Sequence, residues 1–454
     1  MAGPIPQVTA AARPDADEVK PGLHAWIGLG ILMLLAFVSY LDRQIIALMI
    51  GPIESSLKIH DTEIGWLQGA AFAIGYPFFF IPIGYAADRY SRRWVIFWAA
   101  VFWGACAMAS GLAASFGQLF LARVGVGLGE AAVGPAVAAL LSEIFPKRRL
   151  ATIMSIYGSG IVLGSGGALS LGNAVIEWAK AGMDVPVFGH LASWQVAFIV
   201  TGAPALLLAF LVFFVPEGAR GRPKTRPAAA PWSDVFAFAR LNWVFLTCYT
   251  AGQMLLYSLA VASLSWLPEI MRRTYHWTAV ELGAQLALWT VLFGFFGQLA
   301  NGLVVDRLFR KWDDAHMRYF VVGSLLIALS GLIAPFAPTA LFYLAIMGPG
   351  KYLLNFTGVF SAALQVATPP GLRGRMTALT SVVFITIGSI AGPSMVAFFT
   401  DAVFHDKAKA VWSLAITFSI CAPLAAVLLA ISLKPMREAV QRERVATLAA
   451  AAAS

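Results

Sequence analysis

The amino-acid sequence predicts an all-α, polytopic membrane protein in which twelve transmembrane helices form two parallel six-helix repeats. Three observations predict this fold class. Of the 454 residues, 59% are hydrophobic and only 12% are charged, so a soluble protein of this length would lack polar surface for its domains. The chain contains twelve apolar runs that are long enough to cross a bilayer. A ten-residue motif also occurs once in each half of the chain, at the same place in each group of six runs.

The composition also excludes other classes of protein. The mean hydropathy of +0.76 comes from continuous apolar runs, whereas the strands of a transmembrane barrel alternate apolar and polar residues. The three cysteines (Cys106, Cys248 and Cys421) fall inside apolar runs without metal-ligand spacing. We therefore interpret them as packed side chains and expect no metal site.

A membrane-spanning helix needs about 20 apolar residues, and two groups of six runs meet this requirement. The first group covers residues 24–50, 62–87, 94–115, 117–144, 150–176 and 192–215. The second group covers residues 240–270, 279–306, 318–336, 338–367, 376–400 and 408–433.

The polar segments divide the chain into five parts. Residues 1–21 lack the apolar core of a signal peptide, so we expect a disordered cytosolic tail. Residues 217–237 are rich in Arg, Pro and Ala, which is typical of a linker. The two six-helix bundles therefore cover residues 22–216 and 238–434, and residues 435–454 form a second cytosolic tail.

The distribution of basic residues predicts the orientation in the membrane. With the N-terminus inside, 23 of the 32 Lys and Arg residues lie on the cytosolic side, and six lie on the outer side. The positive-inside rule then places both termini in the cytosol. The net charge of +9 is therefore expected to face anionic lipid rather than nucleic acid.

The repeated motif has the form G-x-x-x-D-R-x-x-[RK]-[RK]. The copy that ends the second run contains Gly84, Asp88, Arg89, Arg92 and Arg93. The copy that ends the eighth run contains Gly302, Asp306, Arg307, Arg310 and Lys311, each 218 residues after its counterpart. The glycine permits close helix packing, and the basic cluster anchors the loop to the cytoplasmic leaflet. One copy is explained by a positive-inside loop end, but two copies at a constant offset indicate a duplicated unit.

The two copies resemble the signature loop of the major facilitator superfamily, and the resemblance covers the whole chain. In the fourth run, Arg123, Gly127 and Gly129 resemble the R-x-x-x-G-x-G pattern of that superfamily's helix four. Gly125 and Gly129 also place small residues on one helix face, which predicts close contact with a neighbouring helix. The resemblance implies a major facilitator fold that transports by alternating access.

Five ionisable side chains lie well inside the spans: Asp42, Arg43, Arg123, Glu130 and Lys351. Each costs at least ~2.5–3.5 kcal/mol at the centre of a lipid-facing helix, so each is expected to face a partner or a water-filled cavity. Arg123 and Glu130 are two helical turns apart and share one face.

We expect Glu130 to carry a proton, with Arg123 as its counter-charge. Asp42 and Arg43 would form a competing pair, because a nearby arginine lowers the proton affinity of a carboxylate. The alternative is a permanent salt-bridge network that holds the first and fourth helices together.

Lys351 has no acidic neighbour in its own span, which suits an anionic head group such as phosphate or carboxylate. The alternative is that Lys351 pairs across the cavity with Glu130 or Asp42. The further residues that we expect to bind substrate are Tyr352, Asn355, Tyr257, Gln253 and Trp289.

At the cytosolic face, Glu143, Arg149 and Arg373 stand near the two copies of the motif. We expect them to form ion pairs between the halves with Asp88 and Asp306 and so close an inner gate. The alternative is a solvated loop surface.

The combination of Asp42-Arg43 in the first run with Gly129-Glu130-Ala131 in the fourth resembles the Spinster branch of the superfamily, as does Gly65-Trp66-Leu67-Gln68. Members of that branch are proton-linked transporters of lysolipids and sphingolipid phosphates, which implies an amphipathic anionic lipid as substrate, with Lys351 at its head group. The sequence lacks the long eukaryotic extensions, so we expect a protein of a bacterial inner membrane. The runner-up is the anion:cation symporter branch, which shares both charged motifs and implies small organic anions such as sugar acids.

An integral membrane enzyme or a channel would need features that this sequence lacks. The six histidines are scattered in or beside loops without an H-x-x-x-H pattern, and no filter-like loop or ring of charges occurs. We therefore expect a transporter without a cofactor, driven by the proton gradient. Its expected partners are the lipid bilayer, protons and a small-molecule or lipid substrate, with no nucleic acid, and we expect a monomer.

Overall fold

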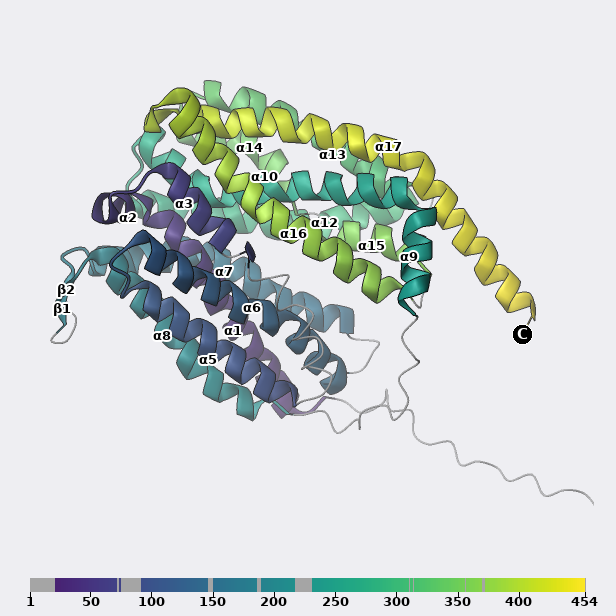
Figure 1. Cartoon of the computed structure of the whole chain (residues 1–454), viewed down its shortest axis with the longest axis horizontal. Coiled ribbons are helices and arrows are strands. Elements are labelled where there is room, and N and C mark those ends of the chain that lie inside the picture. Colours follow the sequence, from purple (N-terminus) through teal and green to yellow (C-terminus); the bar gives the residue numbers. More distant parts are fainter. Residues whose placement is uncertain are drawn as a thin grey trace, which may run out of the picture.

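Two bundles of helices lie side by side in the computed structural model of the protein (Figure 1). The structure describes residues 21–71, 73–74, 91–145, 150–185, 189–216, 231–309, 311–312, 314–355, 357–369 and 372–453. The expected N-terminal tail therefore lies almost entirely outside the described residues.

The first bundle contains the helices from α1 to α8. In chain order they are α1 (Leu23–Leu48), α2 (Ile50–Leu57), α3 (Asp61–Gln68), α5 (Arg92–Ser110), α6 (Phe116–Ile144), α7 (Leu150–Trp178) and α8 (Ser193–Leu211), followed by the short 3-10 helix η2 (Val212–Phe214). An antiparallel hairpin of β1 (Met183–Val185) and β2 (Gly189–Leu191) joins α7 to α8. No strand was expected in this loop, because three-residue strands are too short for a pattern of alternating residues to be recognised.

The second bundle contains the helices from α9 to α17. They are α9 (Trp232–Leu241), α10 (Trp243–Tyr275), α11 (Ala279–Glu281), α12 (Ala287–Phe309), α13 (Ala315–Ile333), α14 (Ala340–Leu353), α15 (Thr357–Ala367), α16 (Arg373–Phe398) and α17 (Ala410–Ala453). Shorter helical segments are η3 (Leu282–Leu286), η4 (Ala334–Phe336), η5 (Phe399–Phe404) and η6 (Lys407–Lys409).

Two boundaries differ from the expected ones. Helix α9 begins at Trp232, inside the segment expected as a linker, because Pro231 precedes it and Asp234 in its first turn suits the positive end of the helix dipole. Helix α17 continues beyond the last apolar run to Ala453. The segment expected as a C-terminal tail is therefore helical as far as this residue.

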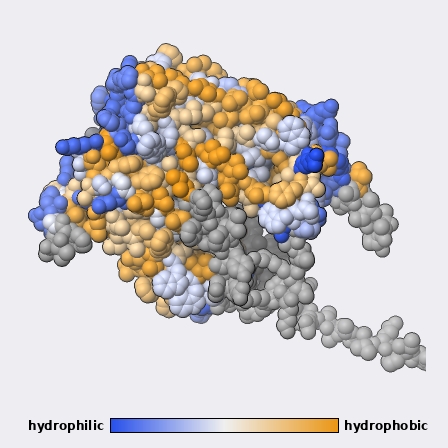
Figure 2. Space-filling view, in the orientation of Figure 1, coloured by the Kyte–Doolittle hydropathy of each residue, from blue (hydrophilic) through white to orange (hydrophobic). Residues whose placement is uncertain are grey.

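Within the described residues, nine helices are long and apolar enough to cross a membrane. They correspond to nine of the twelve expected spans. Of the other three, the second lies largely outside the described residues, the eighth is divided among α11, η3 and α12, and the tenth is divided between α14 and α15. Hydrophilic residues gather at two ends of the molecule, with a hydrophobic band between them (Figure 2), as expected for a membrane-spanning protein.

Small residues allow helices of the first bundle to pack closely. A Cβ atom placed on Gly129 of α6 would lie 2.7 Å from the Cβ of Trp103 in α5, and one placed on Gly125 would lie 2.5 Å from the Sγ of Cys106. The close contact expected at these two glycines is therefore confirmed. On α7, Gly164 packs in the same way against the backbone of Phe37 in α1.

The two bundles contact each other at the end of the molecule where α2, α3 and the β1–β2 hairpin lie (Figure 1). We call it the α2 end; η5 and η6 belong to it through their contacts with α3 and α2, and so does α11, which directly precedes η3. Here α3 packs on α16, and a Cβ atom placed on Gly65 would lie 3.0 Å from the Cβ of Ala397. On the other side, the Ser170 hydroxyl of α7 donates a hydrogen bond to the carbonyl oxygen of Gly283 in η3, at 2.6 Å.

Candidate functional site

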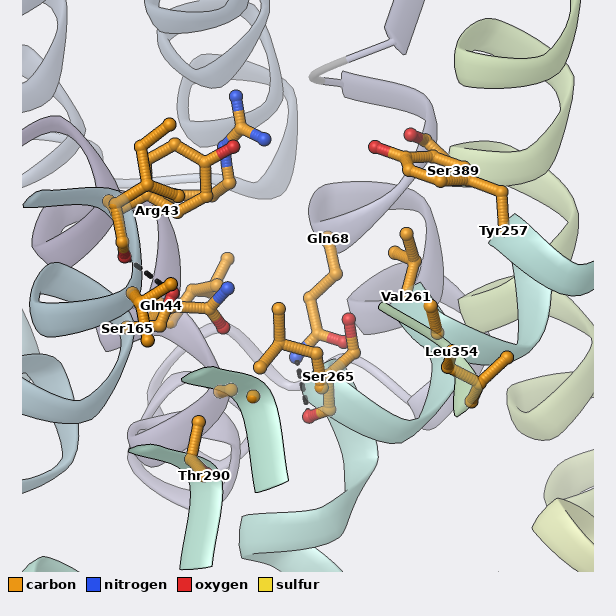
Figure 3. Close-up of a pocket in the computed structure, with 18 of the residues that line it drawn as sticks. Arg43, Gln44, Gln68, Ser165, Tyr257, Val261, Ser265, Thr290, Leu354 and Ser389 are labelled. Atoms are coloured by element: carbon orange, nitrogen blue, oxygen red, sulfur yellow. Dashed lines mark hydrogen bonds between the residues drawn. The ribbon is translucent and has the colours of Figure 1, made fainter. Parts of the chain in front are cut away.

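A cavity of about 320 Å³ lies between the two bundles, with walls formed by α1, α3, α6 and α7 on one side and by α10, α12, α14 and α16 on the other. In Figure 3, Arg43 and Gln44 lie on one side of this cavity, and Tyr257 and Ser389 lie across from them. Its volume is within the range typical of small-molecule sites. Both halves of the repeat therefore contribute polar groups to one site, as alternating access requires.

Two ion pairs join α1 to α6 beside the cavity. The Nη1 atom of Arg123 lies 2.9 Å from Oδ2 of Asp42, and both side chains are buried. The Nη2 atom of Arg43 lies 2.8 Å from Oε2 of Glu130, whose Oε1 accepts a hydrogen bond from the Ser39 hydroxyl at 2.6 Å.

The expected pairing of Glu130 with Arg123 is therefore wrong, because each acid pairs with a base on the other helix in a crossed arrangement. Successive residues of an α-helix point about 100° apart, so Asp42 and Arg43 cannot face each other and instead reach different turns of α6. Arg43 is the most exposed of the four, with 25% of its side chain accessible. Both arginines line the cavity, whereas the carboxylates lie behind them.

The cavity also holds a cation from the second bundle. Lys351 lines it beside Asn355 and Leu354, at the point where α14 ends and α15 has not yet begun. Within the described part of the chain, no carboxylate lies within ion-pair distance of the Lys351 ammonium group. This cation is therefore available to an anionic ligand.

Hydrogen bonds from two asparagines stabilise the break between α14 and α15. The side-chain amide of the buried Asn301 donates to the carbonyl oxygens of Tyr352, at 3.0 Å, and of Asn355, at 2.9 Å. The Asn355 amide in turn donates to the carbonyl oxygen of Lys351 at 2.7 Å. These bonds satisfy carbonyl groups that the interrupted helix leaves free.

Three residues expected to bind substrate do not line this cavity. Tyr352 is not among the lining residues and contacts α12 through its backbone. Gln253 is buried and lines neither this cavity nor the smaller one beside it. Trp289 lines only the smaller cavity and donates its indole N–H to the carbonyl oxygen of Leu344 at 2.9 Å. Spacing along the sequence did not reveal which face of each helix is turned inward.

Tyr257, Lys351 and Asn355 do line the cavity, as expected. The sequence analysis missed other polar lining residues: Tyr40, Gln44, Gln68, Ser165, Thr290 and Ser389. Gln68 ends the Gly65-Trp66-Leu67-Gln68 motif, which resembles the Spinster branch but was not expected to line the cavity. Its amide lies 3.5 Å from the carbonyl oxygen of Ser265 in the other half.

Most residues of the expected inner gate cannot be placed. Gly84, Asp88, Arg89 and Arg149 lie outside the described residues, and Glu143, Gly302 and Asp306 are described only by their place in α6 and α12. Arg92 and Arg93 begin α5, and Arg307 lies in the last turn of α12. Arg373, at the start of α16, donates to the carbonyl oxygen of Thr368 at 2.9 Å. The ion pairs proposed for that gate remain a prediction.

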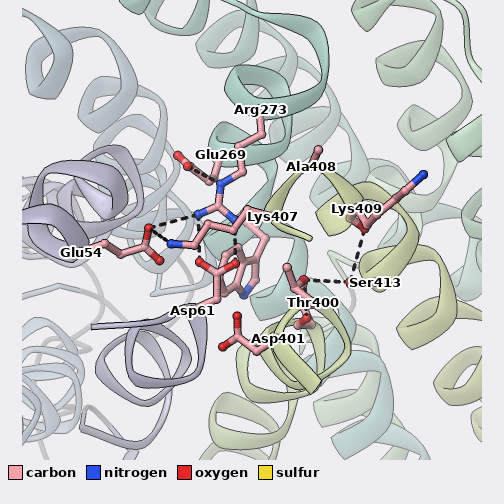
Figure 4. A network of polar contacts seen from close by, with 12 residues as sticks. Glu54, Asp61, Glu269, Arg273, Thr400, Asp401, Lys407, Ala408, Lys409 and Ser413 are labelled. Carbon is pink, nitrogen blue, oxygen red and sulfur yellow. Dashed lines mark hydrogen bonds and ion pairs between the residues drawn. The ribbon is translucent and has the colours of Figure 1, made fainter. Parts of the chain in front are cut away.

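A second charged cluster, which the sequence did not indicate, lies at the α2 end (Figure 4). Arg273 of α10 makes two hydrogen bonds to the Asp61 carboxylate of α3, at 2.6 and 2.9 Å, and its Nε donates to Glu269 at 2.6 Å. Lys407 of η6 pairs with Glu54 of α2 at 2.6 Å.

A further contact lies beside this cluster, because Asp401 of η5 accepts hydrogen bonds from the backbone and hydroxyl groups of Thr62. These bonds connect the two bundles and close the α2 end. In the sequence, Arg273 and Lys407 are only two of the six basic residues on the expected outer side.

Two helical bundles around a cavity lined by charged residues from both, with one motif repeated in the sequence of each half, are typical of a secondary transporter. The chain belongs to the Major Facilitator Superfamily, whose family model matches residues 32–393. The expected fold class and the expectation that the chain is a transporter rather than an enzyme are therefore confirmed.

Several characterised proteins are similar to this chain. An MFS-type efflux pump of Mycolicibacterium smegmatis is 27% identical over 396 residues, which cover 86% of this chain and 88% of the pump. A hexuronate transporter of Bacillus subtilis is 25% identical over 388 residues, covering 82% of this chain and 86% of that transporter. Proteins named spinster and sugar-acid transporters are both among the relatives.

The fold is similar to the crystal structure of a bacterial homolog to the human lysosomal transporter Spinster in an inward-facing, unoccupied conformation. The TM-score is 0.74 at 19% identity, and the match covers 93% of this chain and 98% of that chain.

Proposed function

We propose that the protein is a proton-coupled transporter of an amphipathic organic anion, with an anionic lipid such as a lysophospholipid as the first candidate. The observation that carries this proposal is the presence of Arg43 and Lys351, one from each half, in the same cavity. A phosphate or carboxylate group between them would receive charge-assisted hydrogen bonds from both halves. Apolar lining residues such as Ile161, Val261 and Leu264 would contact the hydrocarbon part.

The Glu130–Arg43 pair supports a mechanism for proton coupling. While Glu130 is ionised, it holds the Arg43 guanidinium at 2.8 Å. Protonation of Glu130 would remove that attraction and free Arg43 for the anion, so proton and substrate would favour each other's binding. Transport further requires that the two access states differ in proton affinity. In this proposal Asp42 and Arg123 form the second pair, which changes partners or protonation as the halves rock.

A second candidate substrate is a sugar acid. The cavity wall carries hydroxyl and amide groups from both halves, including Ser165, Thr290 and Ser389, which match a polyhydroxylated anion. The similarity to a hexuronate transporter supports this candidate, whereas the resemblance of Asp42-Arg43 and Gly129-Glu130-Ala131 to the Spinster branch supports the lipid.

We further propose that the protein lies in a bacterial inner membrane as a monomer, with both termini in the cytosol and the α2 end facing outward. The basic residues are concentrated toward the opposite end, in accordance with the positive-inside rule.

Transport by reconstituted protein tests the function. Proteoliposomes would receive a labelled lysophospholipid or a labelled hexuronate, with and without an imposed pH gradient. We expect gradient-driven movement of the lipid by the wild-type protein and its loss in Glu130→Gln. Movement of the hexuronate alone would select the second candidate. Gradient-driven transport that persists in Glu130→Gln would contradict the role of Glu130.

A further inference from the structure

At the α2 end, three carboxylates are buried around one guanidinium group. The side chains of Asp61, Glu269 and Glu54 are 0%, 3% and 9% exposed, and that of Arg273 is 10% exposed. Figure 4 shows Glu54, Asp61 and Glu269 arranged around Arg273, with Lys407 reaching in from η6. Burial of this much negative charge is unfavourable unless each oxygen atom has a hydrogen-bond donor or a proton.

One oxygen atom in the cluster has neither. Oε2 of Glu54 accepts from Lys407 at 2.6 Å, but Oε1 is buried and has no hydrogen-bond partner among the described residues. Both oxygen atoms of Asp61 already accept from Arg273. The two carboxyl groups flank the same nitrogen atom, because Nη2 of Arg273 lies 2.9 Å from Oδ1 of Asp61 and 3.6 Å from Oε2 of Glu54. A proton on Glu54 would therefore provide a donor to Asp61 and remove the repulsion between two adjacent carboxylates.

The charged groups on the neighbouring elements do not replace this proton. From α10, the Nε and both terminal nitrogen atoms of Arg273 are directed to Glu269 and Asp61, and the nearest distance to Glu54 is 3.6 Å. Lys407 of η6 is 47% exposed, so solvent screens its attraction.

Two other charged side chains near Glu54 are engaged elsewhere. Arg272 of α10 bonds to Glu269 and is itself partly exposed. Asp401 of η5 accepts from Thr62. The only cation of the cluster that is deeply buried is therefore shared among three acids within the described part of the chain.

The proton affinities follow from this geometry. Burial and the contact with Asp61 raise the pKa of Glu54 to about 8. Burial alone would raise the pKa of Asp61. The hydrogen bonds from Arg273 act against burial and outweigh it, so the pKa of Asp61 is lowered. The proton accordingly resides on Glu54.

We propose that Glu54 and Asp61 form a proton-binding site, separate from the cavity, whose occupancy holds the two halves together at the α2 end. The acids belong to α2 and α3 of the first half, and their partners Arg273 and Lys407 belong to the second half. Opening of this end exposes Glu54 to water, where a glutamate carboxyl has a pKa of about 4.3. The closed state therefore holds one proton that the open state releases, whatever the cavity transports.

The direction of the pH dependence follows from linkage. A group with a raised pKa in the closed state stabilises that state at low pH, and this stabilisation is lost as the pH rises toward 8. One proton changes the open-to-closed ratio about tenfold per pH unit between about 4.3 and 8. Above pH 8 this contribution is constant.

Distances between two spin labels, measured by electron paramagnetic resonance, test the proposal. The labels would be placed at Ser56 of α2 and Val280 of α11, which are exposed at this end on opposite halves, after replacement of the three natural cysteines. We expect the open fraction of the wild-type protein to rise with pH and to level off near pH 8. In Glu54→Gln, the side-chain amide should donate to Asp61 at every pH. We therefore expect this variant to lose the change of about tenfold in the open-to-closed ratio per pH unit that the proton on Glu54 contributes.

The matched control is Glu177→Gln, which makes the same substitution at an exposed acid of α7 whose ion pair among the described residues is with Lys180. We expect this variant to keep the wild-type slope. Equal slopes in the wild-type protein and in Glu54→Gln would overturn the proposal.

Infrared spectroscopy provides a second readout that does not depend on opening. At pH 7, the carbonyl absorption of a protonated carboxyl group should be present in the wild-type protein and in Glu130→Gln, and should lose one component in Glu54→Gln. A spectrum that is unchanged by Glu54→Gln would overturn the proposal. The transport assay of Glu130→Gln addresses a different site, so failure of the proposed function and failure of this proposal are distinguishable.

Discussion

Lys351 is the ionisable side chain in the cavity whose charge the described residues leave unbalanced. The other two cations that line the cavity, Arg43 and Arg123, each hold a carboxylate at less than 3 Å. An unpaired cation away from water is unfavourable, so a protein that needed only stability would have an apolar residue here. The position of Lys351 in the last turn of α14, with its carbonyl oxygen bonded by Asn355, is typical of a ligand-binding residue.

Replacement of Lys351 by methionine separates binding from folding. We expect Lys351→Met to raise the apparent KM for the anion about 10- to 100-fold, since a hydrogen bond to a charged group contributes about 1.5–3 kcal/mol. The thermal unfolding temperature should stay the same or rise, because an unpaired buried charge is removed. Uptake kinetics and thermal unfolding in detergent measure the two effects. The control is Lys409→Met, at an exposed residue of η6. An unchanged KM in Lys351→Met would show that Lys351 does not bind the substrate.

The contact between α5 and α6 affects the placement of the ion pair between Glu130 and Arg43. Gly129 lies against Trp103, directly before Glu130 on α6, and a Cβ atom there would lie 2.9 Å from the Trp103 backbone nitrogen. Any side chain at this position must push the two helices apart. That shift would move Glu130 relative to Arg43 on α1.

Gly129→Ala should therefore destabilise the protein by about 1–3 kcal/mol, which is typical of overpacking. Gly134→Ala on the same helix is the matched control, because among the described residues no atom outside the neighbouring backbone of α6 lies within 4 Å of the Cβ position there. For that variant we expect an unchanged or slightly higher unfolding temperature, since alanine favours helix more than glycine does. Thermal unfolding followed by circular dichroism compares the two, and equal stability would contradict the importance of this contact.

Alternating access concerns the molecule as a whole, and the cluster at the α2 end holds the halves together in the present state. Arg273 bonds to Asp61 in the first half and to Glu269 in its own helix. This geometry requires the planar fork of a guanidinium group, which lysine does not have. The neighbouring Arg272, by contrast, bonds only to Glu269 among the described partners.

Arg273→Lys should consequently increase the open fraction at the α2 end about tenfold, because a two-point charged contact becomes a single one. Distances between labels at Ser56 and Val280 measure this fraction at constant pH. Arg272→Lys is the control and should leave the distribution unchanged. A closed distribution in both variants would show that the packing of α3 on α16, rather than the ion pairs, keeps this end shut.

The sequence by itself determined the membrane class, the number of spans and the duplication, because apolar length and a repeated motif are properties of the chain in one dimension. It also located all five ionisable groups of the spans, since a charge inside an apolar run is conspicuous. The tertiary structure alone decided that Asp42 pairs with Arg123 and Glu130 with Arg43, because pairing depends on how each helix is rotated about its axis. For the same reason Gln253 and Trp289 face away from the cavity while Gln44 and Ser389 face into it.

The cluster of Glu54, Asp61 and Arg273 could not be predicted from the sequence either. Its members are up to 219 residues apart and lie at the ends of spans, where charged residues are ordinary. Only the approach of α2 and α3 to α10 and η6 turns them into a buried network. Loop charges appear the same in sequence whether they face water or each other, and the packing of the two halves makes that difference.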